Sequence, residues 1–180
     1  MRVPGGIRTF GAVLAGWMVA VSCWAAEGPG QEGAGKTDRP LERTRKTVRM
    51  LDDVYKTAVV LITDKYVQDE NDFPAGSAAI ALFKAIKEKN WHEVKLLDVS
   101  GEPYNDENVA KDEFEKAALQ KLKSGETYFD RVENRNDGRY LRAATAIPVV
   151  LEKCTLCHEH YKQAKPGQAI GMLSYTLKIE

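Results

Sequence analysis

The sequence predicts an α+β domain in which an antiparallel sheet packs against helices. Apolar residues recur at three- and four-residue steps in three segments, which predicts helices. Four other segments read as strands, and an Asn-Asp-Gly turn separates two of them. The predicted order is helix, helix, strand, helix, strand, strand, short helix, strand. We expect the longer helices to cover one side of the sheet.

The first helix is expected from Pro40, a residue that suits the first turn of a helix, to about Val67. Its apolar stripe predicts packing on the chain's own domain. The spacing is also close to a heptad, so a homodimer through this N-terminal helix is the alternative. The stripe consists of Leu41, Val48, Leu51, Tyr55, Ala58, Ile62 and Tyr66.

The second helix is expected from Pro74 or Ser77 to Asn90, and a buried strand over residues 94–99 follows it. A turn at residues 100–103 ends this strand.

A third helix and three further strands complete the predicted fold. The helix ends at Ser124-Gly125, and residues 134–138 form the loop of a hairpin. The last strand alternates, with apolar side chains on one face. The helix is expected over residues 112–123, and the strands over 127–133, 139–147 and 169–179.

Residues 154–158, Cys-Thr-Leu-Cys-His, form the C-x-x-C-H motif of c-type haem attachment. Each thiol can add to a haem vinyl group, and the spacing lets one helical turn present both. His158 then binds the iron from one face. The sequence predicts one covalent haem c per chain, with Cys154 and Cys157 as thioethers and His158 as the proximal ligand.

The alternatives for this motif are a redox or disulfide C-x-x-C and half of a zinc site. A zinc site needs four ligands, and the only other cysteine is Cys23, which we expect to be removed. His160 would then have to complete the site, which would crowd four ligands into seven residues. These considerations favour haem.

Residues 1–26 read as a signal peptide. Arg2 and Arg8 supply the positive charge, and an apolar stretch ends in small residues at Ala25-Ala26. Because haem is attached to such motifs outside the cytoplasm, we expect a periplasmic protein. The alternatives are a lipid anchor at Cys23 and an uncleaved anchor, for which the apolar stretch is short.

The rest of the chain divides into a tether and one domain. Residues 27–39 are rich in Gly, Lys and Glu, which predicts a flexible tether. Residues 40–180 suit a single haem domain. Without residues 1–26 the chain has 24 Lys and Arg against 26 Asp and Glu, and no basic stripe stands out. We therefore expect no nucleic-acid partner.

The position of the haem motif separates this chain from the common cytochromes. Small cytochromes c carry the motif near the N-terminus, whereas here it lies near the C-terminus. Cytochromes c′ also carry it near the C-terminus, but they are four-helix bundles, and the strand and hairpin predicted here argue against a bundle.

The chain resembles a family of bacterial c-type haem proteins with a PAS-like α+β domain, over about residues 52–180. Besides the haem motif, the resemblance is carried by residues 94–97 (VKLL), 103–108 (PYNDEN), 114–115 (FE), 139–144 (RYLRAA) and 147–148 (IP), and by Gly167, Ile170 and Gly171.

The resemblance implies a PAS-like sheet with N-terminal helices and a short haem-bearing helix before the last strand. It also implies a stand-alone, sensor-like haem domain. In this family a Cys of the N-terminal helical part can serve as the second axial ligand. This chain has no Cys between Cys23 and Cys154, so another group fills the sixth position or it stays open.

Several side chains are candidates for the distal side of the haem. His92 is the candidate we retain as a distal ligand, although a solvated His at a strand end is the simpler interpretation. His160 is expected on the same side as His158. An open or weakly held position is favoured. The remaining candidates, all expected in the core, are Met50, Met172, Tyr55 and Tyr66.

The haem also needs an apolar pocket and partners for its propionates. Ile147 and Leu156 are expected to line the pocket. Arg142 is expected at the pocket or a propionate, and Arg139 and Lys153 are further candidates.

The expected function is redox or small-gas sensing, with a redox partner protein or a small gas as the partner. A periplasmic electron-transfer cytochrome is the alternative. A haem peroxidase is disfavoured because no acid–base pair is visible, and we expect no enzymatic activity.

Overall fold

Two helices begin the domain, as predicted. A computed structural model describes residues 37–69 and 72–180, and Thr37–Glu180 form one unit. The signal peptide predicted at 1–26 and the tether up to residue 36 lie outside the described residues. Helix α1 (Arg39–Tyr66) starts where the Asp38 carboxylate accepts a hydrogen bond from the Leu41 amide at 3.1 Å. Helix α2 (Ala75–Glu88) follows Pro74.

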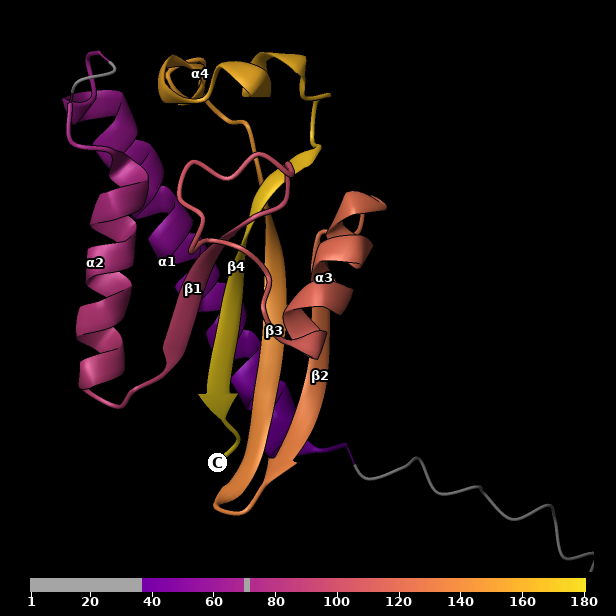
Figure 1. The fold of residues 1–180 in the computed structure, drawn as a ribbon. Coiled ribbons are helices and arrows are strands. Elements are labelled where there is room, and N and C mark those ends of the chain that lie inside the picture. Colours follow the sequence, from indigo (N-terminus) through magenta and orange to yellow (C-terminus); the bar gives the residue numbers. More distant parts are fainter. Residues whose placement is uncertain (1–36, 70–71) are drawn as a thin grey trace, which may run out of the picture. The chain divides into compact units, whose positions relative to one another are not determined.

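Four strands form one antiparallel sheet in the order β1-β4-β3-β2 (Figure 1). The last strand of the sequence therefore lies in the middle of the sheet and is buried over most of its length. The strands are β1 (Glu93–Asp98), β2 (Tyr128–Arg135), β3 (Gly138–Pro148) and β4 (Ala169–Lys178).

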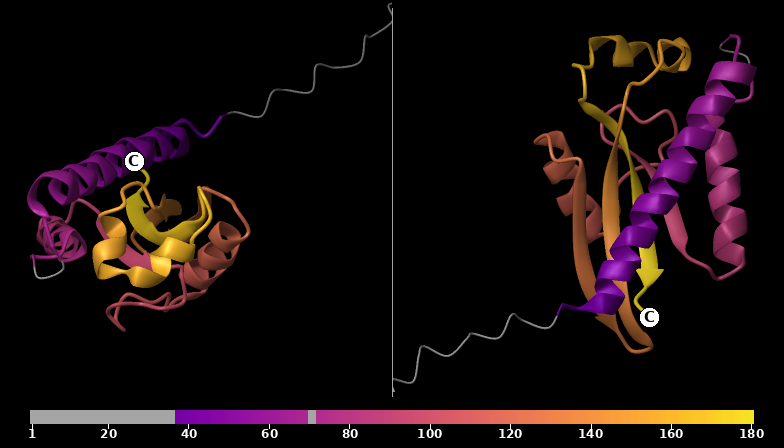
Figure 2. Two further views of the ribbon diagram at one scale, coloured as in Figure 1. Left: turned by 90° about the horizontal axis from the view of Figure 1, so that it is seen from above. Right: turned by 180° about the vertical axis from the view of Figure 1, so that it is seen from behind.

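The helices cover both faces of the sheet, which corrects the expectation of one side (Figure 2). On one face, Tyr55 of α1 and Phe83 of α2 pack with Tyr175 of β4. On the other face, Phe114 of helix α3 (Glu113–Lys123) packs with Met172 of β4. Because side chains alternate along a strand, a middle strand that is buried at nearly every position needs cover on both faces.

The β2–β3 hairpin is tighter than predicted. Residues 134 and 135 pair with 139 and 138, so only Asn136 and Asp137 form the turn. Gly138 has a φ of 141°, a conformation that residues with a Cβ rarely adopt.

The haem-motif segment lies at one end of the sheet. Helix α4 (Cys154–Cys157) and a 3-10 helix, η1 (Glu159–Gln163), connect β3 to β4 near the C-terminal end of α1 (Figure 1). The short helix before the last strand is therefore confirmed. Within the described residues, no helix has both the length and the apolar character needed to cross a bilayer.

An ion pair ties α1 to the far edge of the sheet and gives stability a defined pH dependence. Arg45 donates from Nε to Asp130 Oδ2 at 2.8 Å and from Nη2 to Oδ1 at 3.0 Å. The Tyr128 hydroxyl donates to the same carboxylate at 2.8 Å. Burial raises the pKa of Asp130, but the hydrogen bonds from Arg45 and Tyr128 outweigh it and hold this pKa below its usual value.

We therefore expect Asp130→Asn to lower the free energy of unfolding at pH 7 by about 1–2 kcal/mol. A depressed carboxyl pKa adds stability that is complete above the unfolded pKa of about 4 and is lost below it. The difference between wild type and variant should shrink as the pH falls below about 4 in denaturant titrations. The exposed Asp53, replaced by Asn, is the control. A difference that stays constant down to pH 2 would contradict this assignment.

Candidate functional site

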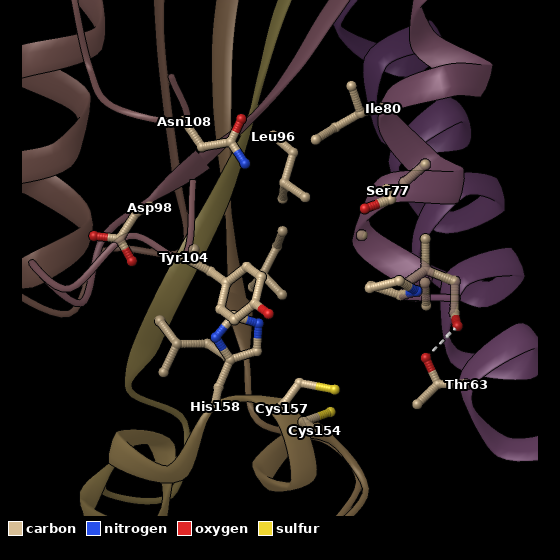
Figure 3. Close-up of a pocket in the computed structure, with 18 of the residues that line it drawn as sticks. Thr63, Ser77, Ile80, Leu96, Asp98, Tyr104, Asn108, Cys154, Cys157 and His158 are labelled. Carbon is tan, nitrogen blue, oxygen red and sulfur yellow. Dashed lines mark hydrogen bonds between the residues drawn. The ribbon is translucent and has the colours of Figure 1, made fainter. Parts of the chain in front are cut away.

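A cavity of about 310 Å³ lies between α1, α2, one end of the sheet and the haem-motif segment. Its lining is mostly apolar, as is usual for cofactor sites. Figure 3 shows Cys154, Cys157 and His158 on one side, across from Thr63, Ser77 and Ile80. The structure thus brings the three residues of the haem motif to a single apolar cavity.

The two cysteines reach the cavity from one helical turn. Cys154 and Cys157 are three residues apart in α4, so their side chains share a face of the helix. Both thiols are half-buried and form no disulfide. Lys153 holds the segment in place, because its Nζ donates to the carbonyl oxygens of Asp64 and Val67 at 2.8 Å each, at the end of α1.

His158 is held by stacking rather than by hydrogen bonds. Its ring stacks on Tyr161 with centroids 4.5 Å apart, and it makes a T-shaped contact with Tyr104 with centroids 5.5 Å apart. Burial lowers the pKa of His158, which favours the neutral imidazole that binds metals. Its Nδ1 atom is buried and has no hydrogen-bond partner among the described residues.

These groups are the donor set that a covalently attached haem requires. Two thiols and a neutral imidazole border one apolar space, and the imidazole carries a buried polar atom without a partner. Among the described residues, no group of three or more His, Cys, Asp or Glu side chains could hold a metal ion. The two thiols and the imidazole at one apolar cavity fit haem.

Of the two apolar residues predicted to line the haem pocket, only one lies at the cavity. Ile147 lines the cavity. Leu156 does not: it is 42% exposed, because the residue before Cys157 cannot share the helix face of the two cysteines.

Arg142 also lies away from the cavity, which corrects its expected place at the pocket. Its guanidinium donates to Asp112 at 2.8 Å and to Glu133 at 3.2 Å, on the face covered by α3. Arg139, the neighbouring candidate, pairs with Asp38 at the start of α1. Among the described residues, the cations that line the cavity are Lys56 and Lys153.

The structure does not bring His92 into the cavity either. Its Nε2 shares a hydrogen bond with the Tyr55 hydroxyl at 2.8 Å, and burial lowers the pKa of His92. His160 lies beside His158, with ring centroids 5.8 Å apart, and its Nε2 is 3.4 Å from the Ser100 hydroxyl. It therefore lies on the side of His158, as predicted.

The other distal candidates divide between core and surface. Met172 and Tyr55 are buried, as expected, and Tyr55 also lines the cavity. Met50 and Tyr66 are 57% and 77% exposed, which corrects the expectation that they belong to the core. Apart from residues of the haem motif, the described lining of the cavity contains no His, Met or Cys.

Lys56, Asp98, Tyr104 and Tyr161 are among the polar side chains of the site that sequence reasoning missed. Each comes from a different segment, so the fold alone brings them together. One signal was present in the sequence: Tyr104 lies in the PYNDEN segment that carried the family resemblance.

The chain matches known proteins in both sequence and fold. The Tll0287-like family model matches residues 37–175. The fold is similar to the crystal structure of the cyanobacterial haem protein Tll0287, with a TM-score of 0.51 and 14% identity over 76% of this chain and 95% of that chain. No curated protein matches the sequence. The expected resemblance and the PAS-like α+β fold are confirmed, and the chain belongs to the Tll0287-like family.

Proposed function

We propose that this chain is a periplasmic, mono-haem c-type cytochrome with a sensor-like role. Cys154 and Cys157 hold the haem covalently, and His158 binds its iron. The observation that carries the proposal is that these three side chains border one apolar cavity, and that a buried nitrogen of His158 has no hydrogen-bond partner within the described part of the chain. The family relationship to a haem protein supports it.

The sixth coordination position is proposed to be open to a small neutral ligand. The wall across from His158 presents side chains such as Thr63, Ser77 and Ile80, none of which is a strong ligand of haem iron (Figure 3). A vacant position allows the ligand change that a gas or redox sensor needs. When bound, the haem supplies the redox and ligand-binding chemistry of its iron.

The protein's own contribution is an apolar pocket and counter-charges for the propionates. Lys56 donates to Asp52 at 2.9 Å and to the Ala146 carbonyl at 2.7 Å, and Lys153 donates to two carbonyl oxygens. Each ammonium therefore keeps one of its three N–H donors for a carboxylate. We assign the propionates to these lysines in place of Arg142.

Electron transfer is the second candidate function, and one observation favours it. Val150, which precedes the haem motif, is 55% exposed, and Leu156, within the motif, is 42% exposed. Exposed apolar side chains next to a haem can provide a contact surface for a redox partner protein.

Visible spectra of the purified protein distinguish the two functions. With an open position, the reduced protein should be five-coordinate and its spectrum should change when CO is added. A six-coordinate, low-spin spectrum that CO does not change would contradict sensing and favour electron transfer. Absence of a covalent haem band on a denaturing gel would refute both.

A further inference from the structure

His158 lacks a partner that an iron-bound histidine normally has. A histidine that binds a metal through one ring nitrogen usually donates the other N–H to a carboxylate, a carbonyl oxygen or a water. The Nδ1 atom of His158 is buried and makes no hydrogen bond to any described residue. The contacts of its ring with Tyr104 and Tyr161 are between rings, so they leave this nitrogen unsatisfied.

Asp98 is the only acidic side chain among the described residues that line the cavity. It ends β1 and lies on the same side of the cavity as His158 (Figure 3). Its Oδ1 accepts from the Ser100 hydroxyl at 2.6 Å, and its Oδ2 accepts from the Gly101 amide at 2.7 Å. The Ser100 amide also donates to Oδ1, at 3.2 Å. These bonds fix the carboxylate and leave Oδ2 able to accept a further hydrogen bond.

Asp98 also acts electrostatically on His158. Burial and the nearby His160 lower the pKa of His158, whereas Asp98 acts in the opposite direction. Asp98 also contributes to the raised pKa of Tyr161, the ring that stacks on His158, although burial is the main cause there. These directions agree with the placement of Asp98, His158 and Tyr161 in the lining of one cavity.

We propose that Asp98 is a positioning residue for His158, and that it accepts the Nδ1–H, directly or through one bridging water, when Nε2 binds the haem iron. This inference rests on the proposed function. A carboxylate on Nδ1 fixes the ring orientation and makes the imidazole a stronger donor, which stabilises the oxidised iron. Ser100 would hold the carboxylate in place.

The test is Asp98→Asn in the haem-loaded protein. The variant should have a higher reduction potential, and the iron–histidine stretching band of its reduced, five-coordinate form should move to lower frequency in resonance Raman spectra. Glu102→Gln is the matched control, because Glu102 lies in the loop that follows Asp98 but its side chain is 74% exposed. Ser100→Ala removes a hydrogen bond of the loop but keeps the carboxylate, so it should shift both readouts less than Asp98→Asn.

An Asp98→Asn protein with the wild-type potential would overturn the inference, as would equal shifts in Asp98→Asn and Glu102→Gln. Should Asp98→Asn fail to fold, Asp98→Glu replaces it: the charge moves by one methylene, and an unmoved potential would refute the role. A wild type without covalent haem would refute the proposed function instead. A six-coordinate wild type would refute only the open position, and the potential would still test Asp98.

Discussion

Replacing both Cys154 and Cys157 with Ala is expected to abolish covalent haem attachment. Both thiols border the cavity from one helix turn, and no other described residue is a cysteine. Without a thioether, haem would be held only by His158 and the pocket, so denaturation should release it. The measurement is the haem stain on a denaturing gel, together with the mass of the intact chain.

Two variants provide the controls for this experiment. His160→Ala, two residues beyond the iron ligand, should keep the covalent haem, because the structure places His160 outside the described lining of the cavity. Cys154→Ala alone should leave a single thioether and a shifted reduced absorption band. Haem that remains covalently bound in the double variant would contradict the assignment of the motif.

Replacing Arg142 with Met is expected to lower the free energy of unfolding by about 3–5 kcal/mol without loss of haem. The guanidinium pairs with Asp112, lies 3.7 Å from the Glu115 carboxylate and covers the Phe114 ring at 4.6 Å. Glu115 is 1% exposed, and its other cation is Lys95 at 2.8 Å. Removing Arg142 therefore leaves the buried Glu115 carboxylate with Lys95 as its remaining nearby cation.

The readouts for this variant are a urea titration and the haem content per chain. Arg131→Met is the control. Arg131 lies opposite Arg142 in the register of the β2–β3 hairpin, but its side chain is exposed. It should change stability by no more than about 0.5 kcal/mol. If Arg142→Met lost haem at unchanged stability, the result would instead support the expected role of Arg142 as a partner of a haem propionate.

The sequence was sufficient for the order and type of the elements, because these depend on local patterns. The α1 stripe has the helical period, and the final strand alternates. The sequence analysis did not predict that helices cover both faces of the sheet. Residues 169–173 (AIGML) are nevertheless apolar on both faces of the strand. A run of this kind indicates burial on both faces, so that signal was present.

The site was predictable where it is local in sequence and unpredictable where it is not. Cys154, Cys157 and His158 are neighbours in the chain, and their spacing alone places them on one turn. Arg142 was misplaced because a strand residue's face depends on register, and a cation in a strand can serve a haem or an ion-pair network equally well.

The sequence by itself therefore determined the motif, the family and the succession of helices and strands. Only the tertiary structure decided what surrounds His158. Tyr104, Asp98 and Lys56 come from a loop, a strand end and a helix, and no local pattern links them. A motif and a periodic pattern depend on residues that are close together in the sequence. The far wall of a cavity is instead formed by packing between segments that are distant in the chain.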